Sequence, residues 1–293
     1  MTERHRAQIS LVLSAAAFST GGLFVGLLDN IDVWTILFWR SLFALGFTLL
    51  WAMFRVDGRA IVDLDRPALA AAVFSAAATL LFIPALKLTS VADVAVIHGA
   101  LPLLTAVLAR LIGNEPVGTL TLCLCAGIAI GTLVIFAGSA PTETRFYGDC
   151  LALAMTAFMA LMTIAFRRSK SQSALAAVAA SNAISTMVAA GFMAKHAVPL
   201  GALAILAGFA LFQMTLGLIF FAGGARLLAP AETAILSLTE VPLSPLWVWI
   251  AFGSRPRVQT VLGGGLILTA VLVHLIVNRS NAVPIPRQPD CKE

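Results

Sequence analysis

Ten apolar runs, each about as long as a helix that crosses a bilayer, follow one another along this chain with short polar segments between them. Within lipid, a spanning segment has to satisfy its backbone hydrogen bonds internally, and an α-helix does so. An outer-membrane barrel would show short alternating segments instead. The sequence therefore predicts an all-α integral membrane protein with ten transmembrane helices. The expected spans are Ser10–Leu28, Val33–Phe54, Pro67–Leu88, Val91–Ile112, Val117–Ala137, Tyr147–Phe166, Ala174–Ala194, Gly201–Ala222, Pro230–Phe252 and Val258–Val277.

The composition supports a membrane chain. Only 11% of the 293 residues are charged and the mean hydropathy is +0.96, whereas a soluble domain carries roughly 25% charged residues. The four cysteines, at positions 123, 125, 150 and 291, show neither a disulfide framework nor a zinc spacing. We therefore expect no metal and no cofactor.

The chain repeats itself after 140 positions. Residues 85–116 fall on residues 225–256, so that Ala85 meets Ala225 and Pro102 meets Pro242. We place a first five-helix repeat at 1–140, a second at 141–278 and a disordered cytoplasmic tail at 279–293. Because each repeat has an odd number of spans, the second must enter the membrane inverted. Inverted repeats are typical of secondary transporters, whose substrate site lies between the repeats around a central cavity, although some channels share them.

The basic residues predict the orientation. If the N-terminus is cytoplasmic, 13 Lys and Arg residues fall in the inner segments and 5 in the outer loops, as the positive-inside rule requires. Both termini are then cytoplasmic, and the protein is a multi-pass protein of the cell inner membrane. The net charge of +5 follows from this topology, so it does not indicate a nucleic-acid partner.

The repeat also resembles a known family. Ala85-Leu86 before a turn, Pro102 within a helix, the exit residue Glu115 and the glycines Gly127 and Gly131 resemble the repeat of the EamA-type family, in the drug/metabolite transporter (DMT) superfamily. The second repeat is similar through Ala225, Pro242 and Gly263-Gly264, and departs from the pattern at Ser254-Arg255. The resemblance implies ten helices, cytoplasmic termini and export of small metabolites. As a whole, the sequence is similar to those of the aromatic amino-acid exporter (YddG-type) branch.

Three polar residues near mid-depth of the second repeat are the first candidates for substrate binding: Asn182, Gln213 and Glu240. A charge at the bilayer centre costs roughly 2.5–3.5 kcal/mol on insertion scales, which makes Glu240 a functional candidate. Beside Pro242, which removes a helix hydrogen bond, its carboxylate could hold a substrate ammonium or a proton. Alternatively, Glu240 pairs with another helix, and the two amides serve interhelical hydrogen bonds.

Arg40 and His98 lie roughly 10 Å inside the outer boundary, at 1.5 Å per residue, and could share one polar layer. Arg40 could meet a substrate carboxylate, or instead cap carbonyls or pair with Asp93. His98 titrates near neutral pH, or it packs as a hydrogen-bonded side chain. Phe18, Thr79, Phe158 and Met159 are candidates for the cavity wall, with ordinary packing as the alternative.

These features favour a secondary transporter that exports small metabolites by alternating access, with amino acids, including aromatic and hydrophobic ones, as the expected substrates. A drug or other metabolite exporter of the same superfamily and an uncoupled channel remain alternatives. An enzyme is not expected, because the histidines at positions 5, 98, 196 and 274 form no catalytic cluster. A phosphate-binding loop is absent from the sequence, so ATP is not expected to drive transport. The expected partners are a small-molecule substrate and the lipid bilayer, and the oligomeric state stays open.

Overall fold

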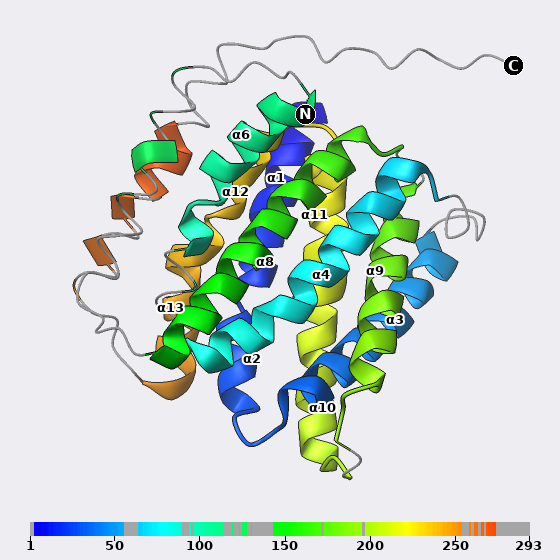
Figure 1. Cartoon of the computed structure of the whole chain (residues 1–293). Helices are drawn as coiled ribbons and strands as arrows, with labels where there is room; N and C mark the ends of the chain where they lie inside the picture. The colour runs from blue at the N-terminus through cyan, green and yellow to red at the C-terminus, as the bar shows by residue number, and fades with distance from the viewer. Residues whose placement is uncertain are drawn as a thin grey trace, which may run out of the picture.

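The structure, a computed structural model, is a bundle of helices (Figure 1). Its described residues are helical or irregular throughout. It describes residues 3–55, 64–89, 94, 97–113, 119, 123, 125–127, 130, 143–170, 173–194, 197–253, 258, 261–262, 265–266 and 268–273. The first half contributes α1 (Glu3–Phe18), α2 (Gly21–Leu27), α3 (Val33–Arg55), α4 (Arg66–Leu88) and α6 (Leu101–Gly113). The second half contributes α8 (Glu143–Arg168), α9 (Ser173–Ala190), α10 (Leu200–Phe209), the π-helical turn η2 (Ala210–Leu216), α11 (Gly217–Ala225), α12 (Pro230–Ser237) and α13 (Glu240–Phe252).

Within the described residues, seven helical segments are long and apolar enough to cross a membrane, and Leu101–Ile112 is a shorter apolar helix. The protein is therefore a multi-pass helical membrane protein. Four expected spans coincide with the continuous helices α3, α4, α8 and α9. The expected spans at 117–137 and 258–277 lie largely outside the described residues, so the count of ten stays a prediction.

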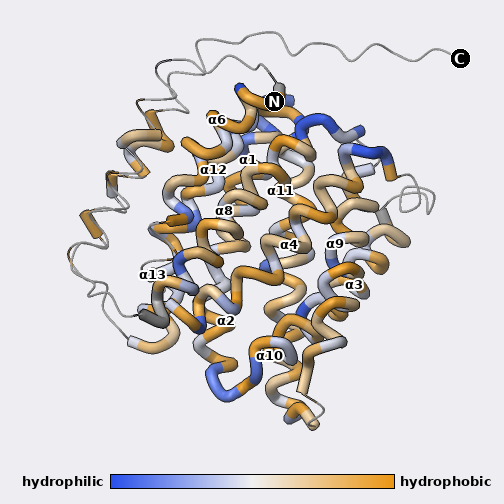
Figure 2. The backbone as a smooth tube through the Cα atoms, viewed as in Figure 1, coloured by the Kyte–Doolittle hydropathy of each residue, from blue (hydrophilic) through white to orange (hydrophobic). Residues whose placement is uncertain are grey.

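The membrane-spanning character is visible on the surface of the bundle. Met53, Leu111 and Met187 are 76%, 75% and 76% exposed, which a water-facing surface would not favour over so large an area. In Figure 2 hydrophobic residues cover the bodies of the helices, while hydrophilic residues gather at the turns. The outward-facing apolar side chains are thus available to lipid.

The expected first span is not one helix but two. Ser19 and Thr20 separate α1 from α2, and each hydroxyl donates a hydrogen bond of 2.7 Å to a backbone carbonyl of the preceding turn, at Ala16 and Ala17 respectively. Such bonds compete with the helix for its carbonyls, and Gly21-Gly22 follows directly, which weakens the helix further. The local sequence Ser-Thr-Gly-Gly therefore accounts for the break.

The expected ninth span is also divided, between α12 and α13 at Leu238–Thr239. Pro242 lacks a backbone N–H and its ring conflicts with the carbonyl of Leu238, four residues earlier. In the first repeat, α6 likewise starts one residue before Pro102, after a turn at Ala100. The span expected from Val91 is therefore continuous, within the described residues, only from Leu101. Proline tolerates the first turn of a helix, where its missing donor is not needed.

The expected eighth span contains the wider turn η2 between α10 and α11. A π-helical turn inside an α-helix is frequent at functional sites, because it turns a side chain away from the regular spacing. Here the turn carries Gln213, which is 4% exposed. The irregularity thus coincides with one of the candidate polar residues.

Contacts made by charged side chains mark the two ends of the bundle. At one end, here called the basic end, Arg4 forms a salt bridge of 3.1 Å with Glu232, Arg167 donates to the carbonyl of Arg226 and Arg168 to that of Ile112. At the other end, here called the Asp29 end, Lys87 lies 3.2 Å from Asp29. Thr89 and Asp149 share a hydrogen bond of 2.7 Å at the Asp29 end as well.

The two halves of the chain pack into each other. α4 lies against α8 and α9, α3 against α9, α1 against α11, and α6 against α8 and α12 (Figure 1). Each of these pairs joins an element of the first half to one of the second. The buried core therefore lies between the halves, and any space enclosed there has walls from both.

Candidate functional site

A cavity of about 150 Å³ lies between the two halves. Its wall is mainly apolar and includes two phenylalanines and four methionines, with a few polar groups among them. The lining residues are Phe18, Gly22, Arg40, Ser75, Ala78, Thr79, Phe82, Leu86, Val94, His98, Met155, Met159, Met162, Gln213, Met214, Leu218, Glu240, Val241 and Ser244.

Arg40 and Gln213 form the first polar pair of this wall. The Nη1 atom of Arg40, from α3, donates a hydrogen bond of 3.0 Å to the Oε1 atom of Gln213, from η2. The guanidinium is completely buried, and its Cζ atom lies 4.9 Å from the centre of the Phe209 ring, a cation–π distance. Gln213 in turn donates from Nε2 to the carbonyl of Phe18 over 3.3 Å, at the end of α1.

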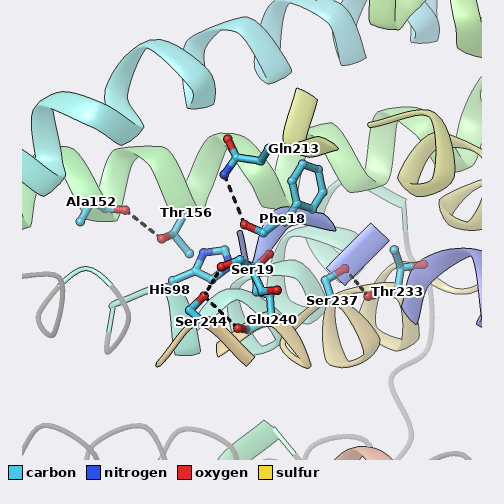
Figure 3. Close-up of polar contacts among 10 residues, drawn as sticks. All are labelled: Phe18, Ser19, His98, Ala152, Thr156, Gln213, Thr233, Ser237, Glu240 and Ser244. Atoms are coloured by element: carbon cyan, nitrogen blue, oxygen red, sulfur yellow. Dashed lines mark hydrogen bonds and ion pairs between the residues drawn. The ribbon is translucent and has the colours of Figure 1, made fainter. Parts of the chain in front are cut away.

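His98 and Glu240 form the second pair (Figure 3). The Nε2 atom of His98 lies 2.8 Å from the Oε1 atom of Glu240, an ion-pair distance, although the ring N–H is not aligned for a hydrogen bond. The Glu240 side chain keeps 16% of its surface exposed and that of His98 keeps 7%. Glu240 begins α13, and a carboxylate is favoured there by the positive end of the helix dipole. The carboxylate is therefore held at the cavity by a partner that is charged only when protonated.

Ser19, at the break between α1 and α2, forms hydrogen bonds with side chains in the first part of α13 (Figure 3). Ser244 donates to the carbonyl of Ser19 over 3.1 Å or to that of Glu240 over 3.0 Å. Trp247 Nε1 donates to the Ser19 hydroxyl over 2.7 Å. The carbonyl and the hydroxyl of Ser19, at the break, thus both have partners on α13. This arrangement links the two broken helices at the level of Glu240.

The structure brings most of the predicted site residues together. Seven of the nine line the cavity: Phe18, Arg40, Thr79, His98, Met159, Gln213 and Glu240. Asn182 and Phe158 do not. Asn182 is buried on α9, with no hydrogen-bond partner for its Nδ2 atom among the described residues, and the Phe158 ring stacks on Phe74 with 6.2 Å between ring centres. Whether any of the nine binds substrate stays a prediction.

Some of the contacts named in the alternatives for the polar residues are present in the structure. Glu240 does pair with another span, through His98, and Gln213 does make interhelical hydrogen bonds. Arg40 uses one nitrogen on Gln213 rather than on backbone carbonyls. The other suggested partner of Arg40, Asp93, lies outside the described residues.

Sequence reasoning missed several lining residues. Met155 and Met162 share one face of α8 with Met159, and the spacing of four and three residues could have indicated that face. Ser244 follows Glu240 by four residues, so it lies on the same side of α13. Phe82 and Met214 carry no comparable signal, because their inward direction depends on helix rotation.

The lining of the cavity is suited to holding a small ligand. Among the described residues, no three His, Cys, Asp or Glu side chains gather as they would around a metal ion. The polar pairs can orient a small ligand, while the methionines and phenylalanines can surround its apolar part.

Comparison with known proteins agrees with this architecture. The sequence model of the EamA-like transporter family matches residues 5–137 and again residues 146–276. A solved crystal structure of another protein superposes with a TM-score of 0.79, at 14% sequence identity, over 94% of this chain and 99% of that one. At this identity the likeness speaks for the fold alone. A search of curated proteins found no significant match. The two family matches together span nearly the whole chain, which therefore belongs to the EamA-like transporter family, within the drug/metabolite transporter superfamily, and has its two-repeat architecture.

Proposed function

We propose that this membrane transporter exports small metabolites, with amino acids as the preferred substrates, across the cytoplasmic membrane by alternating access. The observation that carries the proposal is the cavity, which is walled by both halves and holds a carboxylate and a guanidinium in an otherwise apolar lining. A small amphipathic zwitterion needs few polar partners and a large apolar surface, and this wall provides both. The narrower placement among aromatic amino-acid exporters is part of the same proposal.

An inverted arrangement of the two repeats is also proposed. With the shift of 140 positions, α1 corresponds to α8, and α4 to the run from α10 to α11. Arg4, at the start of α1, and Arg167, near the end of α8, both lie at the basic end. Asp65, before α4, and Arg226, after α11, lie there too. Opposite directions in corresponding helices support the inversion, which lets the halves exchange conformations and open the cavity to either side.

The proposed topology places the basic end in the cytoplasm. In a variant with its cysteines replaced by serine, Asp29→Cys should react with an impermeant maleimide in intact cells. Lys170→Cys should react only after the membrane is permeabilised, because Lys170 lies at the basic end, where its backbone N–H donates to Asp65. Both side chains are exposed, so a difference in labelling between the two positions cannot come from burial within the fold. Labelling of both sites from the same side would contradict this topology.

Reconstitution tests the transport mechanism. The purified protein in vesicles should exchange a labelled amino acid for the unlabelled one placed on the other side, and the flux should saturate. Exchange of this kind requires a carrier with one site that faces the two sides in turn. A flux that grows without saturation would favour the channel alternative. Exchange of cationic drugs but not of amino acids would favour the drug-exporter alternative.

A further inference from the structure

The guanidinium of Arg40 is hydrogen-bonded through one nitrogen, while the nitrogens of another edge have no hydrogen-bond partner among the described residues. Nη1 donates to Gln213, whereas Nε and Nη2 have no hydrogen-bond partner among the described residues. In the planar guanidinium, the N–H groups of Nε and Nη2 point the same way and form a two-pronged fork. This fork matches the two oxygens of a carboxylate.

An unused fork is unusual for a buried cation. Arg40 is 0% exposed, and a buried charge is ordinarily paired and fully hydrogen-bonded, because leaving it without partners is costly. Phe209 covers one face of the guanidinium, but an aromatic face accepts nothing from the edge. The free donors therefore require a partner that the described side chains do not supply.

The other charges of the cavity wall are engaged elsewhere. Apart from Arg40, the ionisable residues of the described lining are His98 and Glu240, and these lie 2.8 Å from each other. Glu240 thus lies against His98, and no hydrogen bond or salt bridge joins it to Arg40. No carboxylate of the described lining contacts the guanidinium of Arg40, so an anionic group on the ligand is its complement.

We infer that the Nε–Nη2 edge of Arg40 is a carboxylate-binding subsite of the cavity, so that the molecules this protein carries bear a carboxylate. The inference rests on the proposed transport function and narrows its substrates. It selects amino acids and other carboxylates over amines and cationic drugs that have an apolar body but no acid group. Arg40 is covered in this conformation, so the inference requires the cavity wall to open before a carboxylate reaches the fork.

Gln213 is the positioning residue of this subsite. Its amide is held at both ends, by Arg40 and by the carbonyl of Phe18, which orients the fork of Arg40. Gly21, the first residue of α2, makes room for that amide, since a Cβ atom there would overlap Gln213 Nε2. The break between α1 and α2 and the turn η2 therefore both help to set the orientation of the Arg40 guanidinium, because both hold Gln213.

A panel of matched ligands tests the subsite without any substitution. Binding of L-phenylalanine and L-leucine to the purified full chain is compared with binding of their decarboxylated amines, 2-phenylethylamine and 3-methylbutylamine. The change in melting temperature with ligand concentration gives each affinity. We expect at least one amino acid to bind about 10- to 100-fold more tightly than its amine, as hydrogen bonds to a charged group imply. Amines that bind within twofold of both amino acids, or amino acids that do not bind, would overturn the inference.

Two variants separate recognition from folding. Arg40→Lys keeps the charge but removes the fork, and Gly21→Ala displaces Gln213 while residue 40 stays an arginine. In both, the preference for the amino acid over the amine should fall toward one, whereas Arg110→Lys, at an exposed position on α6, should keep it. A purely structural role for Arg40 would weaken both ligands equally and leave their ratio unchanged. That outcome would also overturn the inference, and the ligand panel on the unchanged protein still decides if a variant fails to fold.

The flux measurement distinguishes this inference from the transport function on which it rests. If the vesicles exchange amines or cationic drugs as well as or better than amino acids, transport stands and the carboxylate subsite is wrong. If no compound in the panel is exchanged but amino acids bind with the expected preference, the subsite stands and carrier function fails.

Discussion

Glu240→Gln should reduce amino-acid flux about 10- to 100-fold while the protein still inserts into the membrane. Glutamine keeps the size and the hydrogen-bonding oxygen of the side chain but removes the charge that can hold a substrate ammonium or a proton. Hydrogen bonds to charged groups are worth about 1.5–3 kcal/mol, which corresponds to a loss of this size. The measurement is the initial rate of exchange in reconstituted vesicles, normalised to the amount of inserted protein.

The control for this substitution is Glu3→Gln, which makes the same chemical change at an exposed position of α1. It should leave the flux unchanged. Flux at the unmodified rate in Glu240→Gln would mean that the ion pair with His98 is structural only. A large fall in melting temperature together with the loss of flux would also argue for a structural role, so both quantities are measured on the same samples.

Gly224→Ala should lower the melting temperature of the protein by about 2–10 °C, the range that a cost of about 1–3 kcal/mol produces in a large domain. A Cβ atom at Gly224 would lie 2.6 Å from Leu11 Cγ and 2.9 Å from the carbonyl oxygen of Ala7. The Ala7 oxygen belongs to the backbone of α1, so relief of that contact requires α1 and α11 to move apart. Because α1 and α11 come from different halves of the chain, the substitution loosens the contact between the halves.

Gly46→Ala is the matched comparison. Gly46 lies on the exposed side of α3, and a Cβ atom there meets nothing within 4 Å. The change should leave the melting temperature equal or raise it slightly, because alanine loses less backbone freedom than glycine when it enters a helix. Equal effects of the two substitutions would show that the fit between α1 and α11 does not limit stability.

Part of the candidate site was predictable because its signals are local. Glu240 stands beside Pro242, Arg40 and His98 are ionisable groups within apolar runs, and such residues are costly in lipid unless they serve a purpose. Asn182 shows the limit of this reasoning, since it has the same polarity and similar depth as Gln213 but does not line the cavity. Nothing in the residue types separates the two amides. The difference lies in the direction that each helix presents to its neighbours.

The sequence alone determined where the chain can cross a membrane and where its helices are weak. Apolar length, proline and the Ser-Thr-Gly-Gly segment at 19–22 act on the backbone within a few residues, so they can be read along the chain, as can the repeat after 140 positions. Only the tertiary structure decided that Arg40 meets Gln213, 173 residues away, and that His98 meets Glu240. In lipid the outer and inner faces of a helix are both apolar, so the rotation of each helix is decided by packing between distant segments and not by a pattern within one.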